Sequence, residues 1–110
     1  SGFPGTKDRA ENAMSSECRR EGSRVFVRFN GEIDLVNINE LKELLFSLSS
    51  EDVDIELDAS RVEFLDSSGI GMLVLVRKMQ KEKGHTFCLV NIPERVKRGL
   101  TPGTVDLLQC

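Results

Sequence analysis

The stretch Phe64-Leu65-Asp66-Ser67-Ser68-Gly69-Ile70-Gly71 joins two segments of different hydrophobic periodicity. Residues 53–58 before it alternate apolar and acidic side chains, which is typical of a half-buried strand. The segment after it carries apolar residues at helical spacing, namely Met72, Leu75, Val76 and Met79. We therefore expect both serines at the first turn of a helix, where backbone N–H groups lack partners and the dipole is positive. Such a helix end can bind an anion or display a serine whose charge is changed by modification.

The composition predicts one small globular domain. The chain has 110 residues, 39% of them hydrophobic, and no apolar run long enough to span a bilayer. Its 15 basic and 18 acidic residues give a net charge of −3. This balance argues against nucleic-acid binding, which needs a concentrated basic face. We expect neither a nucleic-acid nor a membrane partner.

The cysteine and histidine content predicts no metal site and no cofactor. Cys18, Cys88 and Cys110 form no spaced cluster, and His85 is the only histidine. An odd number of cysteines without a secretory leader favours a reducing cytoplasm. Cys88 lies in an apolar run, so we interpret it as a small buried residue.

Residues 1–14 have little apolar periodicity and are expected to be a flexible leader, with Met14 as a candidate natural start and the residues before it a candidate production remnant. Asn30-Gly31 is expected to close the second strand with a turn, and Asn37 with Glu40 has the spacing of a capping box. The expected elements are strands at 15–20 and 24–29, a helix from 38, a strand at 53–58, a helix from the motif to about 83, a strand at 86–91, a short helix at 94–98 and a last strand at 105–110.

The order of these elements predicts a two-layer α/β domain. Strands joined through helices pair in parallel by right-handed crossovers. The acidic side chains of the strand at 53–58 indicate that one sheet face is wet, so the helices should lie mainly on the other face. The first half of the long helix is apolar nearly all round and should be largely buried. The strand at 86–91 is nearly continuously apolar, which suits a position covered on both faces.

Three motifs in register resemble STAS domains, and within them the bacterial anti-sigma factor antagonists. They are the stretch Phe64 to Gly71, the turn Asn30-Gly31-Glu32-Ile33-Asp34, and the segment Pro93-Glu94-Arg95-Val96-Lys97-Arg98. The resemblance covers residues 24–110 and implies a single STAS domain over residues 15–110, with a mixed, mostly parallel sheet. The family usually has a longer helix after the third motif and a further amphipathic helix. We therefore expect the C-terminal helix to be absent or truncated here.

The resemblance also implies a function. In the family, the serine directly after the motif aspartate is phosphorylated by an anti-sigma factor that is also a serine kinase, and here that phosphoacceptor is Ser67. The unphosphorylated protein binds the anti-sigma factor and frees the sigma factor, the phosphorylated form dissociates, and a phosphatase restores it. The implied partner-binding residues are Asp34, Asp66, Ser68, Gly69, Ile70 and Gly71.

Other interpretations remain open at this point. The serines can serve only as helix caps, and the glycines can serve only a tight turn with close packing. An enzyme is disfavoured, because His85 is expected at the far end of the long helix and the motif lacks the glycine two residues before the serine that a nucleophile elbow needs. A nucleotide-sensing module, or a STAS domain that serves a transporter or a stress complex, remains an alternative.

Overall fold

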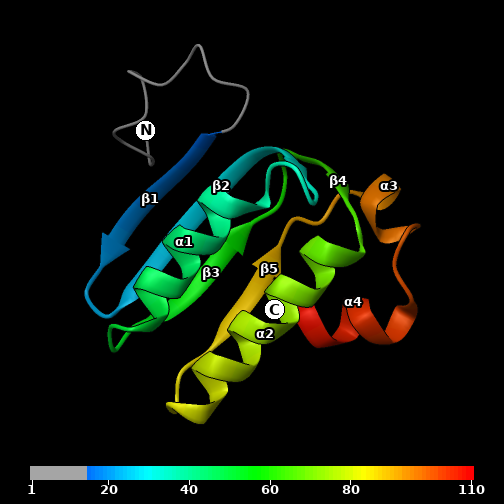
Figure 1. Cartoon of the computed structure of the whole chain (residues 1–110). Coiled ribbons are helices and arrows are strands. Elements are labelled where there is room, and N and C mark those ends of the chain that lie inside the picture. The colour runs from blue at the N-terminus through cyan, green and yellow to red at the C-terminus, as the bar shows by residue number, and fades with distance from the viewer. Residues whose placement is uncertain (1–14) are drawn as a thin grey trace.

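The computed structural model describes residues 15–110 (Figure 1). The expectation of a flexible leader falls on residues 1–14, which lie outside the described part. The elements are β1 (Ser15–Glu21), β2 (Arg24–Ile33), α1 (Ile38–Ser49), β3 (Asp54–Asp58), β4 (Val62–Leu65), α2 (Ser67–Glu82), β5 (Phe87–Val90), α3 (Glu94–Lys97) and α4 (Pro102–Leu108).

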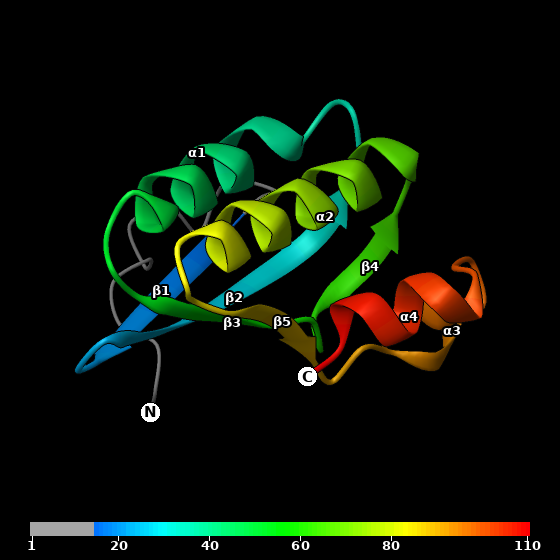
Figure 2. The same cartoon turned by 90° about the horizontal axis from the view of Figure 1, so that it is seen from below.

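The sheet is mixed and mostly parallel, as predicted. Its strand order is β1-β2-β3-β5, with β4 also paired to β2. β1 is antiparallel to β2, whereas β2 pairs in parallel with β3 and β4, and β3 pairs in parallel with β5. Figure 2 shows α1 and α2 side by side over one face of the sheet, while α3 and α4 lie at its edge near β4 and β5. The two-layer α/β prediction is confirmed.

The two faces of the sheet differ as the strand patterns predict. Alternate residues of β2 and β3, such as Val25, Phe29 and Ile55, are fully buried under α1 and α2. On the open face, the register places Arg24 opposite Asp54 and Arg28 opposite Asp58. The Arg28 guanidinium lies 3.4 Å from the Asp58 carboxylate, so basic and acidic side chains pair across the strands there.

β2 is longer than expected, because its second half finds a partner. Asn30 and Gly31 do not close the strand with a turn. The strand continues to Ile33 with a register irregularity at Gly31 and Glu32, where Gly31 takes a φ of 129°. β4, which the sequence did not indicate, pairs with this extension. The extension brings the end of β2 beside the start of α2.

The C-terminal part of the described chain also differs from the prediction. The last strand expected at 105–110 is the helix α4 instead. The Thr101 hydroxyl accepts a hydrogen bond from the Thr104 N–H at 3.2 Å, and Pro102 follows at the first helical position, which together favour a helix start. Leu108 is fully buried and anchors α4. Gln109, just after α4, forms an isolated β-bridge to Leu89.

Two further expectations are wrong, and a third holds with one exception. β5 is an edge strand with one face under the helices, not a strand covered on both faces. The first half of α2 is largely buried, as predicted, through Met72, Leu73 and Val76, but Leu75 is 44% exposed. Asn37 occupies the N-cap of α1 but makes no side-chain capping hydrogen bond.

The prediction for Cys88 is also wrong. It forms a disulfide with Cys110 and is only half-buried, whereas Cys18 is a free cysteine. The sequence contains both residues, but nothing in their spacing indicates that the folded chain brings residue 110 back to β5. The pairing is a product of the tertiary structure.

Candidate functional site

The N-terminal end of α2 is built around Asp66, which is the N-cap residue with an extended backbone. One oxygen of its carboxylate accepts the Ser68 hydroxyl at 2.6 Å and the Gly69 N–H at 2.9 Å. The other oxygen accepts the Leu35 N–H at 3.2 Å, from the loop between β2 and α1. These hydrogen bonds, that from Ser68 first, hold the pKa of the Asp66 carboxyl below its ordinary value, so the site carries a fixed negative charge.

Asp34 performs the corresponding role at the start of α1. Its carboxylate accepts the Val36 N–H at 3.1 Å and the Asn37 N–H at 2.9 Å. Ile33 pairs with Leu65 in the parallel β2–β4 ladder, so the next residues, Asp34 and Asp66, leave neighbouring strands together. The structure therefore brings both predicted carboxylates to one edge of the domain, each organising the start of one helix.

The two serines differ in their surroundings. Ser68 is half-buried and its hydroxyl donates to Asp66. Ser67 is the first residue of α2, is exposed, and its hydroxyl makes no hydrogen bond within residues 15–110. Asp66, not a serine, caps the helix, so the capping interpretation does not account for Ser67. Its hydroxyl is available at the positive end of a helix dipole.

The two glycines also differ, although the sequence treats them alike. Gly69 is buried, and a Cβ at this position would lie 2.7 Å from the Ile33 carbonyl oxygen and 2.7 Å from Leu65 Cδ1. Its missing side chain lets α2 approach β2 and β4 closely. Gly71 is exposed, and a Cβ there would meet no atom within 4 Å. The packing of the domain therefore does not require a glycine at position 71, and the missing side chain leaves the helix surface open there. Ile70 between them is half-buried.

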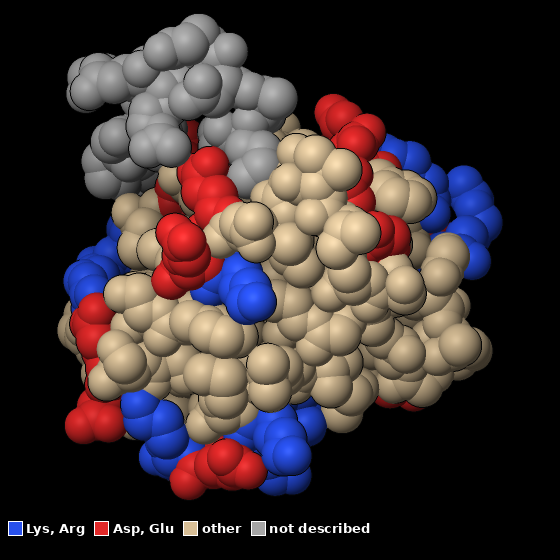
Figure 3. Space-filling model, viewed as in Figure 1, with Lys and Arg blue, Asp and Glu red and all other residues tan. Residues whose placement is uncertain are grey.

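An apolar surface that the sequence analysis missed adjoins these residues. A groove of about 450 Å³ runs between α1 and α2. Leu35 is 74% exposed, Val36 is 84% exposed and Leu75 is 44% exposed; we refer to these three residues as the apolar patch. Figure 3 shows a broad uncharged area over the middle and right of this face, with acidic side chains at its upper border. The groove is lined by Leu35, Ile38, Asn39, Lys42, Phe46, Ser68, Gly71, Met72 and Leu75.

A signal for the apolar patch was present in the sequence. Leu35 and Val36 are large apolar residues placed directly between Asp34 and Asn37, where a solvated loop would ordinarily carry polar side chains. Their exposure follows from the way Asp34 and Asp66 hold the loop backbone. An exposed cluster of large apolar side chains marks a surface that binds another molecule.

Among residues 15–110, no side chain is hydrogen-bonded to the Ser67 hydroxyl as a catalytic base would be. His85 follows α2, whose 16 residues span about 24 Å, and it contacts Asp54 at 3.1 Å. Ser67 lies at the other end of the helix. Within the described residues, no three histidine, cysteine or carboxylate side chains gather as a metal site, and no helix is long and apolar enough to cross a bilayer.

Known proteins share this architecture. The family model for the STAS domain matches residues 15–106. An anti-sigma-B factor antagonist of Bacillus subtilis (strain 168) is 30% identical over 85 residues, which are 77% of this chain and 78% of that relative. The crystal structure of an anti-sigma factor antagonist from Mycobacterium paratuberculosis is 25% identical, with a TM-score of 0.61 over 74% of this chain and 72% of that one. The anti-sigma factor antagonist SpoIIAA in its unphosphorylated form shares the fold, with 18% identity and a TM-score of 0.73 over 86% of each chain. The chain belongs to the STAS domain family.

Proposed function

We propose that the chain is an anti-sigma factor antagonist whose binding is switched by phosphorylation of Ser67. The unphosphorylated chain binds an anti-sigma factor that is also a serine kinase, and the sigma factor is released. The phosphorylated chain dissociates, and a phosphatase restores it. The observation that carries this proposal is the exposed Ser67 hydroxyl, which makes no hydrogen bond within residues 15–110 and lies at the start of α2. The next residue, Ser68, lines the groove together with Leu35 and Leu75. The names of the relatives support the antagonist part of this proposal, whereas the phosphorylation switch rests on the site itself.

The docking surface in this proposal consists of the apolar patch, Ser67, Ser68 and Gly71. Burial of exposed apolar side chains supplies the main favourable term in protein association. The open space at Gly71 lets a partner approach the helix backbone between Ser68 and Leu75. Asp34 and Asp66 stabilise this surface through hydrogen bonds to the backbone of the β2–α1 loop and of the first turn of α2. Gly69 is buried, so it shapes the surface without reaching a partner.

A phosphate on Ser67 changes the charge of this surface more than its shape. It adds about −1.5 to −2 charges at pH 7. The helix terminus favours this charge, whereas the ionised Asp66 next to it opposes it, so the fold should persist. A partner covering the surface would have to desolvate the phosphate without a matching cation. A loss of about 1.4 kcal/mol already weakens binding tenfold, so no large conformational change is needed.

This function requires binding and no catalysis by the chain itself. The His85 side chain is bonded to Asp54 at the opposite end of α2, and the Ser67 hydroxyl has no base among residues 15–110. A partner that acts on a sigma factor also places the chain in the cytoplasm, where sigma factors work. No observation on the described residues favours nucleotide sensing or a role in a transporter over protein docking.

The proposal is tested by incubation with ATP-binding anti-sigma proteins from the same genome, with Mg-ATP. We expect one phosphate per chain, mapped by peptide mass spectrometry to Ser67. Ser67→Ala should remain unmodified and bind the partner constitutively, while the matched variant Ser68→Ala should still be phosphorylated. Phosphate incorporated into the Ser67→Ala chain would assign the acceptor elsewhere.

The docking surface has its own test. Leu75→Glu places a charge in the apolar patch, and we expect calorimetry to show at least a roughly tenfold weaker complex with the anti-sigma factor. Leu107→Glu is the matched control, because Leu107 is a 38% exposed leucine on α4. Equal effects of the two substitutions on affinity would contradict the assigned surface.

A further inference from the structure

We propose that Cys88 and Cys110 form a reversible redox site, which a dithiol reductant opens and a disulfide oxidant closes, and which clips the segment Gln109–Cys110 to the edge of the sheet. The bond joins the edge strand β5 to the residue two positions beyond α4. The site is separate from the docking surface at the start of α2.

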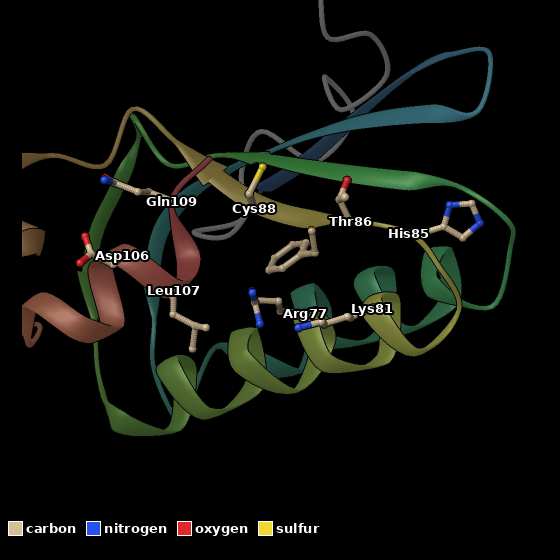
Figure 4. A pocket seen from close by; sticks show the side chains of 9 residues that line it. Arg77, Lys81, His85, Thr86, Cys88, Asp106, Leu107 and Gln109 are labelled. Atoms are coloured by element: carbon tan, nitrogen blue, oxygen red, sulfur yellow. The ribbon is translucent and has the colours of Figure 1, made fainter.

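The bond lies where a reductant can reach it. β5 is at the edge of the sheet, and its residues Phe87 and Leu89 are buried toward the helices. Cys88 lies between them and faces the opposite, open side of the sheet, as its half-buried state and Figure 4 show. Cys110 is exposed, with its Cα 5.0 Å from that of Cys88. Thiol–disulfide exchange depends on such access.

Few other contacts hold the clipped segment. Gln109 and Cys110 are both exposed. They join the sheet through the bridge between Gln109 and Leu89 and through the hydrogen bond from the Cys110 N–H to the Leu89 carbonyl, at 3.0 Å. The Gln109 N–H also donates to the Val105 carbonyl of α4 at 2.9 Å, so Gln109 stays tied to the helix end and Cys110 is the less restrained residue. Leu108, by contrast, is fully buried and retains α4. Opening the disulfide therefore frees the segment at Cys110 and leaves the rest of the domain folded.

Release of the segment would change a second groove. This groove, of about 400 Å³, runs between α2, β5 and α4 (Figure 4). Its lining includes Arg77 and Lys81 of α2 and Leu107 and Gln109 near the end of the described chain. Because Gln109 belongs to the clipped segment, the redox state affects this end of the groove and the accessibility of the β5 edge.

The exchange balances as a two-electron step. A thiolate of the reductant attacks the sulfur of Cys110, forms a mixed disulfide and expels the Cys88 thiolate, which takes up a proton. The second thiol of the reductant then attacks the mixed disulfide and releases the Cys110 thiol. The protein gains two electrons and two protons, and the reductant leaves as its disulfide. A disulfide oxidant such as oxidised glutathione reverses both steps.

Cys18 provides an internal reference for this site. It is half-buried on β1 and stays reduced, and burial raises the pKa of its thiol, which disfavours the reactive thiolate. In a reducing compartment, disulfides are usually transient and redox-sensing. This last argument alone uses the cytoplasmic location proposed above.

The test treats the folded chain with a reduced dithiol protein of the thioredoxin type, followed by alkylation and mass spectrometry. We expect the alkylatable thiols to rise from one, Cys18, to three, with both new adducts at Cys88 and Cys110. Hydrogen exchange at the Cys110 amide should accelerate by roughly tenfold or more, with exchange in β2 and β3 unchanged. Oxidised glutathione should restore the starting state.

Two variants make the result decisive. Cys110→Ser should show the fast exchange with or without reductant, and Cys18→Ser should behave as the parent chain. Reduction that occurs only after denaturation would make the bond a static crosslink and overturn the proposal, as would alkylation of all three cysteines in the oxidised folded chain. No anti-sigma factor takes part in these measurements, so their outcome is independent of the proposed docking function.

Discussion

The two ends of α2 differ in burial and in how their polar side chains are bonded. At the C-terminal end, Gln80 is fully buried and its amide donates to the carbonyls of Val53 and Thr86, at 2.7 and 2.9 Å. Asp54 accepts the Thr86 N–H and contacts His85. At the N-terminal end, the hydroxyl of Ser67 makes no hydrogen bond within the described chain, and apolar side chains stand in solvent.

This difference shows how one helix can both hold the domain together and present a binding surface. At the C-terminal end, the Gln80 amide points inward and joins α2 to the residues just before β3 and β5. The N-terminal end satisfies its backbone through Asp66 alone, which leaves Ser67, Gly71 and the apolar patch unused by the fold. Substitutions at the C-terminal end should therefore affect stability, and exposed ones at the N-terminal end should affect binding.

The largest expected effect is that of Gln80→Ala at the stabilising end. The substitution removes two hydrogen bonds to buried carbonyls and leaves a cavity, so the free energy of unfolding should fall by about 2–4 kcal/mol. Urea unfolding followed by circular dichroism measures this. Its exposed neighbour is the control, since Lys81→Ala should change stability by less than about 0.5 kcal/mol. Similar losses of unfolding free energy in Gln80→Ala and Lys81→Ala would show that the buried Gln80 amide does not stabilise the C-terminal end of α2.

The glycine pair tests the boundary between the two regions. Gly69→Ala forces a Cβ against the Ile33 carbonyl and should cost about 1–3 kcal/mol of stability, measured by thermal and urea unfolding. Gly71→Ala enters open space and should stabilise the helix by about 0.5–1 kcal/mol. We also expect Gly71→Ala to weaken the complex with the anti-sigma factor despite the gain in stability. A Gly69→Ala chain as stable as the parent would refute the close approach.

The serine pair separates structure from function within a single turn. Ser68→Ala removes the hydrogen bond to Asp66 and should lower the free energy of unfolding by about 1 kcal/mol. Ser67→Ala removes a hydroxyl that no described residue contacts, so its effect on stability should stay within about 0.5 kcal/mol. Equilibrium unfolding of both variants measures the contrast. The reverse order would mean that Ser67 supports the fold.

The smallest expected effect is a dependence of stability on acid at both ends. The hydrogen bond from the Thr86 N–H, and then the contact with His85, lower the pKa of Asp54, as the hydrogen bonds from Ser68 and Gly69 lower that of Asp66. A carboxyl whose pKa is lower in the folded state stabilises the fold fully above its ordinary pKa of about 3.9. That contribution is lost as the pH falls through the lowered folded value.

Unfolding measured from about pH 5 to pH 2 should therefore show falling stability, because the unfolded chain binds more protons there. Asp54→Asn and Asp66→Asn each remove one titrating group while keeping an acceptor, so each should flatten part of this dependence. A profile unchanged in both variants would assign the acid sensitivity to other carboxyls.

Much of the architecture follows from local sequence patterns. The alternation in β2 and β3 and the helical spacing of α2 predicted a two-layer α/β domain. Gly84, with a left-handed φ of 81°, ends α2 near the expected Lys83. The periodicity and the end of α2 depend on side-chain spacing and on capping and turn residues, which act over a few positions. That Asp34 belongs to the same surface as the start of α2 was implied only by the resemblance to STAS domains.

Features that depend on contacts between residues distant along the chain could not be predicted from the sequence patterns. β4 and the extension of β2 exist because each pairs with the other. α4 begins with the local cap of Thr101 and Pro102, and the burial of Leu108 holds it against the domain. The disulfide forms because the fold returns Cys110 to β5.

By itself, the sequence determined the strand β3 and the helix α2 on either side of the motif, and that a hydroxyl would lie at the start of α2. Only the tertiary structure decided that Asp66 would cap the helix and leave Ser67 free, that Gly69 would be buried while Gly71 stayed open, and that Leu35 and Leu75 would line one groove. The physical reason is that the two serines, like the two glycines, have the same chemistry and differ only in the atoms that the folded chain places around them.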